Sequence, residues 1–216
     1  MTGIEIERPY LLFLGNARDQ LAAKTAQGIL DWRPDWCIGQ TRLPGCNADL
    51  KIEDMDFQQA AKAGAKTVIV GVANRGGVLS PDWVDMLAGG LELGMDLASG
   101  LHQRLTDHPK LVETAKRLGR ALHDVRHPTR EFEVGSGAKR SGKRLLAVGT
   151  DCSVGKMYTA LALEKEMQER GLKADFRATG QTGIFIAGSG VSIDAVVSDF
   201  VSGAVEWLSP ANDADH

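Results

Sequence analysis

The sequence predicts an α/β protein whose first part forms a parallel sheet and whose second part carries a phosphate-binding loop. Short apolar runs alternate with helical patterns along residues 10–125. A buried strand, a glycine-bounded loop and a helix start then follow one another at 145–157. Strands that alternate with helices are typical of parallel sheets, because a crossover helix must carry the chain back before the next parallel strand begins.

Several segments of the first part have clear patterns. The apolar runs Tyr10–Leu14 and Lys66–Val72 predict strands, and Asp19–Leu30 has helical periodicity. Pro81–Leu93 predicts a second helix, with Ser80 as its N-cap and Pro81 at its first position. Weaker strand patterns lie at Trp36–Gly39, Met95–Leu97 and Ala121–Val125.

The turn after the first predicted strand lacks the glycine pattern of dinucleotide-binding domains. Gly15-Asn16-Ala17-Arg18 does not contain the Gly-x-Gly-x-x-Gly pattern that brings a backbone close to a dinucleotide pyrophosphate. This domain can therefore be Rossmann-like in shape without binding a dinucleotide.

A change of composition at Glu131–Lys143 predicts a domain boundary. Small and charged residues replace the apolar runs there, which is typical of a linker. We therefore expect an N-terminal domain at 1–130, a linker at 131–143 and a P-loop domain at 144–216. The linker holds a basic cluster that we expect to be solvated: Lys139, Arg140, Lys143 and Arg144.

The strand, loop and helix at 145–170 form the strongest functional motif. A loop that closes on Gly155 can point backbone N–H groups inward, the following helix adds the positive end of its dipole, and Lys156 supplies an ammonium group. We expect this loop to bind a phosphorylated ligand. Its residues are Gly149, Thr150, Asp151, Cys152, Ser153, Val154, Gly155, Lys156 and Met157.

Two departures from the common P-loop pattern bear on chemistry. Five residues separate Gly149 from Gly155 where the usual spacing leaves four, and Met157 stands where a Ser or Thr hydroxyl would bind magnesium. Thr159 does not replace that hydroxyl, because two residues along a helix is about 200° around its axis. The pattern argues against ordinary hydrolysis of magnesium-ATP.

Further elements are expected after the loop. The next helix ends before Gly171 and should turn an apolar face toward a sheet. A strand is expected near Ala174–Ala178, turns at Gly180–Gly190 and a helix over Ser192–Leu208. Only about seventy residues follow the linker, too few to cover both faces of a doubly wound sheet, so we expect an incomplete domain. The apolar face expected for the helix after the phosphate loop consists of Met157, Ala160, Leu161, Leu163 and Met167.

The motif at 149–157 resembles the P-loop of dethiobiotin synthetases. Together with Ala178-Thr179-Gly180-Gln181-Thr182-Gly183 and the final Ala211-Asn212-Asp213-Ala214-Asp215-His216, it resembles a narrower family over essentially the whole chain. Members of that family join a Rossmann-like N-terminal domain to a P-loop domain, and they include a D-glutamate N-acetyltransferase. The resemblance thus implies a Rossmann-like parallel sheet followed by an α/β domain of the P-loop nucleoside-triphosphatase type.

The resemblance also implies a reaction. It implies transfer of an acetyl group from acetyl-CoA to the amino group of D-glutamate, with a deacetylase of N-acetyl-D-glutamate as functional partner. On this interpretation the P-loop holds the phosphates of CoA. Asp151 is the candidate base or orienting group, because it lies in the loop, although it can equally cap local N–H groups.

A dicarboxylic substrate calls for cationic partners. Asn74, Arg75 and Gly76 follow a predicted strand at the edge where α/β proteins bind ligands, and they combine a fork donor with a flexible backbone. We expect these residues to bind the substrate. Arg18 and Arg42 occupy comparable loops, and a surface role suits them better.

Other reactive side chains form weaker candidates. Cys152 could accept an acyl group, since the helix start and Lys156 would lower the pKa of its thiol, but a loop cysteine also serves as a small filler. His102, His123 and His127 could act as bases or lie on a polar surface. No spacing among them is typical of a metal site, so we expect no metal.

Composition restricts the class of protein. The net charge is −3, which does not suggest a nucleic-acid partner. No apolar stretch has the length of a membrane span, and no signal-peptide pattern opens the chain. The three cysteines include no Cys-x-x-Cys pair and suit a reducing cytoplasm. We expect a cytoplasmic homo-oligomer.

Two alternative functions remain at this stage. An ATP-dependent ligase or kinase of the dethiobiotin-synthetase type would turn over magnesium-ATP, which Met157 argues against. A non-catalytic nucleotide-binding protein would be stabilised by its ligand and form no product.

Overall fold

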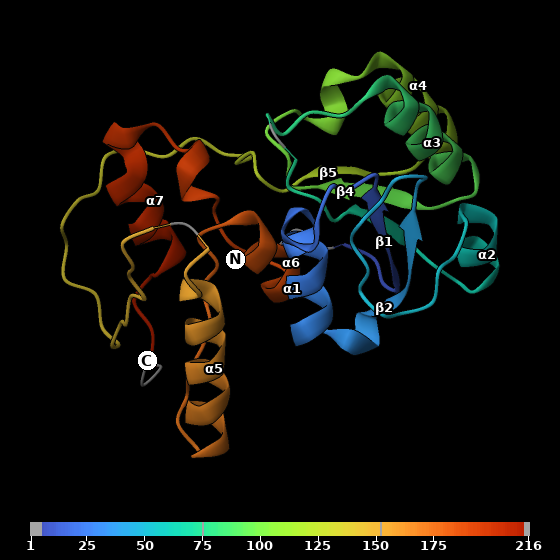
Figure 1. Ribbon diagram of the computed structural model, residues 1–216. Coiled ribbons are helices and arrows are strands. Elements are labelled where there is room, and N and C mark those ends of the chain that lie inside the picture. Colours follow the sequence, from blue (N-terminus) through green and yellow to red (C-terminus); the bar gives the residue numbers. More distant parts are fainter. Residues whose placement is uncertain (1–5, 75, 152, 214–216) are drawn as a thin grey trace.

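The computed structural model describes residues 6–74, 76–151 and 153–213. Its centre is a parallel sheet of five strands in the order β2-β1-β3-β4-β5 (Figure 1). β1 and β3 are buried at every position, as strands covered on both faces must be. The predicted parallel α/β fold is therefore confirmed. The strands are β1 (Tyr10–Gly15), β2 (Cys37–Arg42), β3 (Thr67–Val70), β4 (Asp96–Ser99) and β5 (Leu122–Asp124).

Helices cover both faces of this sheet. From β1 the chain moves outward to β2, whereas from β3 it moves the other way to β4 and β5. Because such crossovers are right-handed, α1 lies on one face, with α2, α3 and α4 on the other (Figure 1). Short 3-10 turns at Gln20–Ala23, Pro34–Trp36 and Leu105–Asp107 join these elements. The helices are α1 (Lys24–Trp32), α2 (Phe57–Lys62), α3 (Pro81–Glu92) and α4 (Pro109–Leu118).

Side-chain capping marks the start of α2, of α3 and of the 3-10 turn that precedes α1. The Ser80 side chain accepts a hydrogen bond from the Trp83 N–H, and Pro81 is the first residue of α3, as predicted. Asp19 caps the 3-10 turn ahead of α1 in the same way. The sequence analysis missed α2, although Asp56 and Gln59 form a reciprocal capping box at its start. It also missed α4.

The carboxyl edge of the sheet is filled by protein at the point where the strand order reverses. This edge, between β1 and β3, is where doubly wound folds usually bind ligands. The Trp83 indole lies directly on Gly15 at the end of β1. After β3, a Cβ atom added to Gly71 would lie 2.5 Å from the Cβ of Ala26. Side chains thus occupy the space that the phosphates of a dinucleotide would need.

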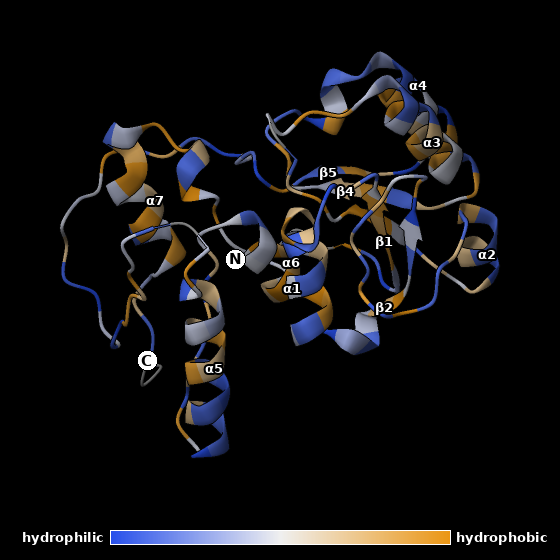
Figure 2. Cartoon of the chain, in the orientation of Figure 1, coloured by the Kyte–Doolittle hydropathy of each residue, from blue (hydrophilic) through white to orange (hydrophobic). Residues whose placement is uncertain are grey.

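The second half of the described chain is helical and forms no named strand. It contains α5 (Lys156–Glu169), α6 (Gln181–Ala187) and α7 (Val201–Leu208), with 3-10 turns at Ile193–Ala195 and Ser198–Phe200. α6 packs against α1, and α5 projects away from the sheet (Figure 1). Figure 2 shows that the far end of α5 is hydrophilic.

The predicted strand before the P-loop is wrong. Residues 145–149 have no regular structure, and Leu146 and Val148 expose 75% and 78% of their surface. A strand needs a neighbouring strand to accept and donate its backbone hydrogen bonds. None of the described residues offers one here, so the continuous apolar run alone does not produce a strand.

Three other predictions for this half need correction. Ala174–Ala178 is not a strand; it contributes only an isolated bridge between Ala178 and Gly190. The expected turns at Gly180–Gly190 contain α6, whose Ile184, Phe185 and Ile186 are buried. The expected helix over Ser192–Leu208 is two 3-10 turns followed by α7.

The expected apolar face of α5 is partly buried, with Met157, Ala160 and Met167 half-buried, but it does not pack on a sheet of the described residues. Leu161 is the one residue of α5 classed as buried, and Leu163 is exposed. Met157 packs against the main core, at the first turn of the helix. The face contacts the N-terminal domain over its first turns and no sheet beyond them.

The segment predicted as a linker is tied to α7. The Glu206 carboxylate accepts hydrogen bonds from the backbone N–H groups of Ser136 and Gly137, which lower its pKa. Arg140 and Arg144 donate to the Ser209 carbonyl at the end of α7. Cations at a helix C-terminus satisfy its last carbonyl groups. These two arginines therefore cap the helix, while Lys139, Lys143 and Arg144 are exposed, in keeping with the expected solvated cluster.

A pair of glycine substitutions tests the packing of α1 on the sheet. Gly71→Ala should lower the free energy of unfolding by about 1–3 kcal/mol, because its methyl group overlaps Ala26. Gly89→Ala is the matched control: it lies inside α3 with open space around it, and should raise stability by roughly 0.5–1 kcal/mol. Urea unfolding followed by circular dichroism measures both. Equal effects would contradict this account of the α1 contact.

Candidate functional site

The loop before α5 has the backbone geometry of an anion-binding turn. Ser153 and Gly155 adopt left-handed conformations, with φ of 57° and 94°. Alternation of left- and right-handed residues turns successive N–H groups toward one side. α5, of 14 residues, starts at Lys156 and points its N-terminus at this loop. The described loop residues therefore suit phosphate.

Lys156 folds back across the loop. Its Nζ donates a hydrogen bond to the backbone oxygen of Asp151. Its aliphatic stem lies over Gly149, where an added Cβ atom would be 3.3 Å from Lys156 Cγ and Cδ and 2.8 Å from Val154 Cγ2. Only glycine fits at 149 without displacing these side chains. The ammonium thus lies on the loop, where a P-loop lysine meets phosphate.

A second cation comes from the N-terminal domain. The Nζ of Lys24, the first residue of α1, donates to the Ser153 hydroxyl at 3.1 Å. Sequence reasoning missed Lys24, because it lies far from the motif along the chain and no local pattern marks it. Its exposed side chain brings positive charge to the same loop as Lys156.

The helix that follows the loop docks on α1 at Gly28. A Cβ atom at Gly28 would lie 2.8 Å from Thr182 Cγ2 and 3.7 Å from both Met157 Cε and the Tyr158 hydroxyl. Met157 therefore packs at the domain contact, in the position where other P-loops carry a magnesium-binding hydroxyl. The Tyr158 hydroxyl donates to Asp31 Oδ2 at 2.6 Å, and burial raises the pKa of this tyrosine, with Asp31 adding to the effect.

Described residues of the expected substrate loop make contacts within the loop. Asn74 Nδ2 donates to the Val78 carbonyl at 2.7 Å, and Gly76 has a φ of 82°. The other amide atom of Asn74, Oδ1, is buried without a hydrogen-bond partner among the described residues. Arg75 lies outside the described residues. This loop adjoins the phosphate loop through α1, because the Ala73 N–H donates to the Ala22 carbonyl, two residues before Lys24.

The remaining charged candidates are engaged elsewhere. Arg42 binds Asp54 through two hydrogen bonds, and Arg18 forms an exposed ion pair with Asp19 at 3.1 Å. Asp151 lies in the exposed loop beside Lys156. Cys152 lies outside the described residues.

The histidines do not converge on the loop. His127 Nε2 donates to the His102 carbonyl at 2.9 Å, and the His102 side chain packs on Gly77. Burial lowers the pKa of His123, on β5. The described part of the chain holds no group of three or more His, Cys, Asp or Glu side chains placed to bind a metal ion. None of the helices formed by the described residues combines the length and apolar character needed to cross a bilayer.

Known proteins resemble this chain over almost all of its length. It is 60% identical over 211 residues to a D-glutamate N-acetyltransferase of Tritonibacter scottomollicae, and 50% identical over 213 residues to a D-glutamate N-acetyltransferase of a Pseudoalteromonas species. These matches cover 98% and 99% of this chain but 63% and 64% of the relatives. The chain therefore spans somewhat under two thirds of the length of its curated relatives.

A solved structure supports the same grouping. The crystal structure of a DUF1611 family protein from Anabaena variabilis matches 94% of this chain and 62% of that protein, with a TM-score of 0.83 and 30% identity. The sequence model for the Rossmann-like N-terminal domain of this family, whose function is unknown, matches residues 41–128. The model for its P-loop domain matches residues 133–216. The chain therefore belongs to the DUF1611 family, in which a Rossmann-like domain precedes a P-loop domain.

Proposed function

We propose that this protein transfers an acetyl group from acetyl-CoA to the amino group of D-glutamate. The names of the relatives at 60% and 50% identity support the reaction. The assignment of this reaction to a site rests on the phosphate loop. Lys156 folds across the loop and Lys24 lies beside it. Two cations next to inward N–H groups suit the phosphates of CoA.

The loop suits phosphate anchoring better than phosphoryl transfer. Transfer of a phosphoryl group from ATP depends on a magnesium ion that bridges the phosphates. Met157 replaces the hydroxyl that would hold that ion, and its side chain packs at the domain contact. Acetyl transfer needs the phosphates only as an anchor, so a loop without that hydroxyl is sufficient.

The reaction requires a nucleophilic amine beside the thioester. A C–N bond forms between the amino nitrogen and the acetyl carbon, and the C–S bond of the thioester breaks. The amine gives up a proton, and the departing CoA sulfur takes one. We assign proton removal to Asp151, whose carboxylate belongs to the loop that would hold CoA. Asn74, Arg75 and Gly76 are the proposed contacts of the amino acid.

The proposal also covers the enzyme that consumes the product, the cellular compartment and the oligomeric state. Its product, N-acetyl-D-glutamate, is an amide, so a hydrolytic deacetylase is the class of enzyme that would consume it. We place the protein in the cytoplasm as a homo-oligomer. Cys37 and Cys46 are free thiols, in keeping with a reducing compartment.

A direct assay tests the activity. The chain is mixed with acetyl-CoA and D-glutamate, and released CoA thiol and N-acetyl-D-glutamate are measured. L-Glutamate and magnesium-ATP serve as controls, and a protein of the full length of the relatives is assayed in parallel. We expect product with D-glutamate and no need for magnesium. Consumption of ATP without acetyl transfer by either protein would support the ligase or kinase alternative.

Lys156→Ala tests the phosphate anchor. Loss of a charge-assisted contact worth about 1.5–3 kcal/mol should weaken CoA binding roughly 10- to 150-fold. Lys165→Ala, on the same helix but paired with Glu169, is the matched control and should leave the affinity unchanged. Calorimetric titration with CoA measures both. A folded Lys156→Ala variant with normal affinity would remove the loop from the binding site.

Lys24→Ala tests the contribution of the N-terminal domain. The exposed ammonium interacts with a bound phosphate across a partly solvated distance, so we expect a smaller loss, about 3- to 10-fold in CoA affinity. The loss should shrink as salt is raised, because the charge is exposed. Lys62→Ala, an exposed lysine at the end of α2, is the control. A salt-independent effect would indicate a packing role for Lys24.

A further inference from the structure

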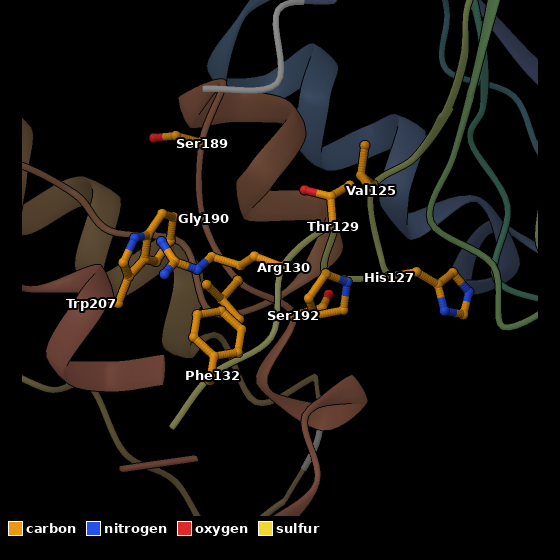
Figure 3. Close-up of a pocket in the computed structure, with 11 residues that line it drawn as sticks. Val125, His127, Thr129, Arg130, Phe132, Ser189, Gly190, Ser192 and Trp207 are labelled. Carbon is orange, nitrogen blue, oxygen red and sulfur yellow. The ribbon is translucent and has the colours of Figure 1, made fainter. Parts of the chain in front are cut away.

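A cavity of about 230 Å³ lies where the segment after β5 meets the loop between α6 and α7. Figure 3 shows residues that line it, which come from three parts of the chain: Val125, residues 127–130 and Phe132; residues 189–192; and Trp207. The cavity is smaller than the roughly 300–1,000 Å³ typical of sites for drug-sized molecules. Its size suits a small metabolite.

An arginine at the rim gives this cavity its charge. The Arg130 guanidinium lies over the rings of Trp207 and Phe132, at 5.1 and 5.5 Å from their centres. Its Nε donates to the Glu131 carbonyl at 3.4 Å, and no carboxylate of the described residues forms an ion pair with it. The ring contacts hold the guanidinium in place, so its outer N–H groups are preorganised for a planar anion such as a carboxylate.

A buried hydroxyl without a partner gives the cavity a second polar group. Ser192 is 2% exposed, and its Oγ makes no hydrogen bond within the described chain. Burying a hydroxyl without a partner costs free energy, and unsatisfied groups of this kind recur at functional sites. The neighbouring charges are already paired, because Arg126 binds Asp194. A ligand in the cavity could satisfy Ser192.

The cavity adjoins the loop proposed to bind the amino acid. His127 lines the cavity, but its ring turns away from it in Figure 3 and donates to the His102 carbonyl. His102 in turn packs on Gly77, in the loop that contains Asn74. One layer of side chains thus separates the cavity from that loop.

We propose that this cavity binds a small organic carboxylate, with its carboxyl group on Arg130 and a second polar group at Ser192. Val125 and Val191 provide apolar walls for the carbon chain between the two. A five-carbon dicarboxylate or amino dicarboxylate fits this pattern. Because a layer of side chains separates the cavity from the Asn74 loop, this is a second carboxylate site beside the proposed contacts of the amino acid. Identification of its ligand as D-glutamate or the N-acetyl product rests on the proposed function; carboxylate binding itself does not.

Calorimetric titration of the full chain with D-glutamate, N-acetyl-D-glutamate and glutarate tests the site. Arg130→Gln should weaken binding of the preferred acid at least tenfold. Arg33→Gln is the matched control, because Arg33 also lies over a tryptophan, Trp36, but outside the cavity. Normal affinity in Arg130→Gln, or no binding of any of the three acids to the unaltered chain, would overturn the proposal.

Ser192→Ala separates binding from folding. Removal of an unsatisfied buried hydroxyl should leave the melting temperature unchanged or raise it, while binding weakens several-fold. A variant that melts lower and binds normally would assign Ser192 to the fold and overturn its role in the site.

The three acids also distinguish this proposal from the proposed function. Binding of glutarate alone, lost in Arg130→Gln, supports the cavity while arguing against the amino acid as its occupant. Binding of D-glutamate that is lost in Arg130→Gln, with no thiol release from acetyl-CoA, supports the cavity and counts against the acetyltransferase. Acetyl transfer and carboxylate binding that are both unchanged in Arg130→Gln retain the proposed function and overturn the cavity as a carboxylate site.

Discussion

The close contact of α5 and α6 with α1 is the constraint on which the candidate site depends. It is possible because Gly28 has no side chain: Thr182, Met157 and Tyr158 all approach the space that a Cβ atom would fill. Gly71 allows a similarly close approach on the side of the sheet, where Ala26 of α1 packs on it. α1 is thus packed between the sheet and the segment that carries the P-loop. This packing sets the position of the loop.

This arrangement explains the unusual residue at 157. In a P-loop that turns over magnesium-ATP, this position carries a hydroxyl that holds the metal. Here Met157 contributes apolar surface to the domain contact instead, beside the Tyr158–Asp31 hydrogen bond and the edge-on contact of Tyr158 with Trp32. Residue 157 thus packs at the domain contact. The residue before it, Lys156, is the lysine that P-loops usually carry at this place. Lys24 then reaches the loop because α1 starts at this contact.

The arginines near α7 and the cavity divide into two groups by their partners. Arg140 and Arg144 donate to carbonyl groups at the end of α7, and Arg126 is paired with Asp194, so these side chains serve the fold. Arg130 rests on aromatic rings, which attract its charge without neutralising it. An aromatic support therefore leaves a guanidinium available to an anion, whereas a carboxylate or a helix end does not.

The sequence by itself determined two kinds of element. They are helix starts that local hydrogen bonds stabilise, and strands that have neighbouring strands in the sheet. Tyr10–Leu14 and Lys66–Val72 were predicted as strands and correspond to the buried strands β1 and β3, and Ser80 with Pro81 marked the start of α3. Glycine and lysine at 155 and 156 correctly indicated a turn at a helix start. The apolar run at 145–149 did not produce a strand, because an apolar run favours burial and does not specify the neighbouring strand that supplies the hydrogen bonds. Tertiary structure alone decided that Lys24 meets Ser153, and that Arg130 and Ser192 line one cavity. These residues are far apart along the chain, and only packing brings them together.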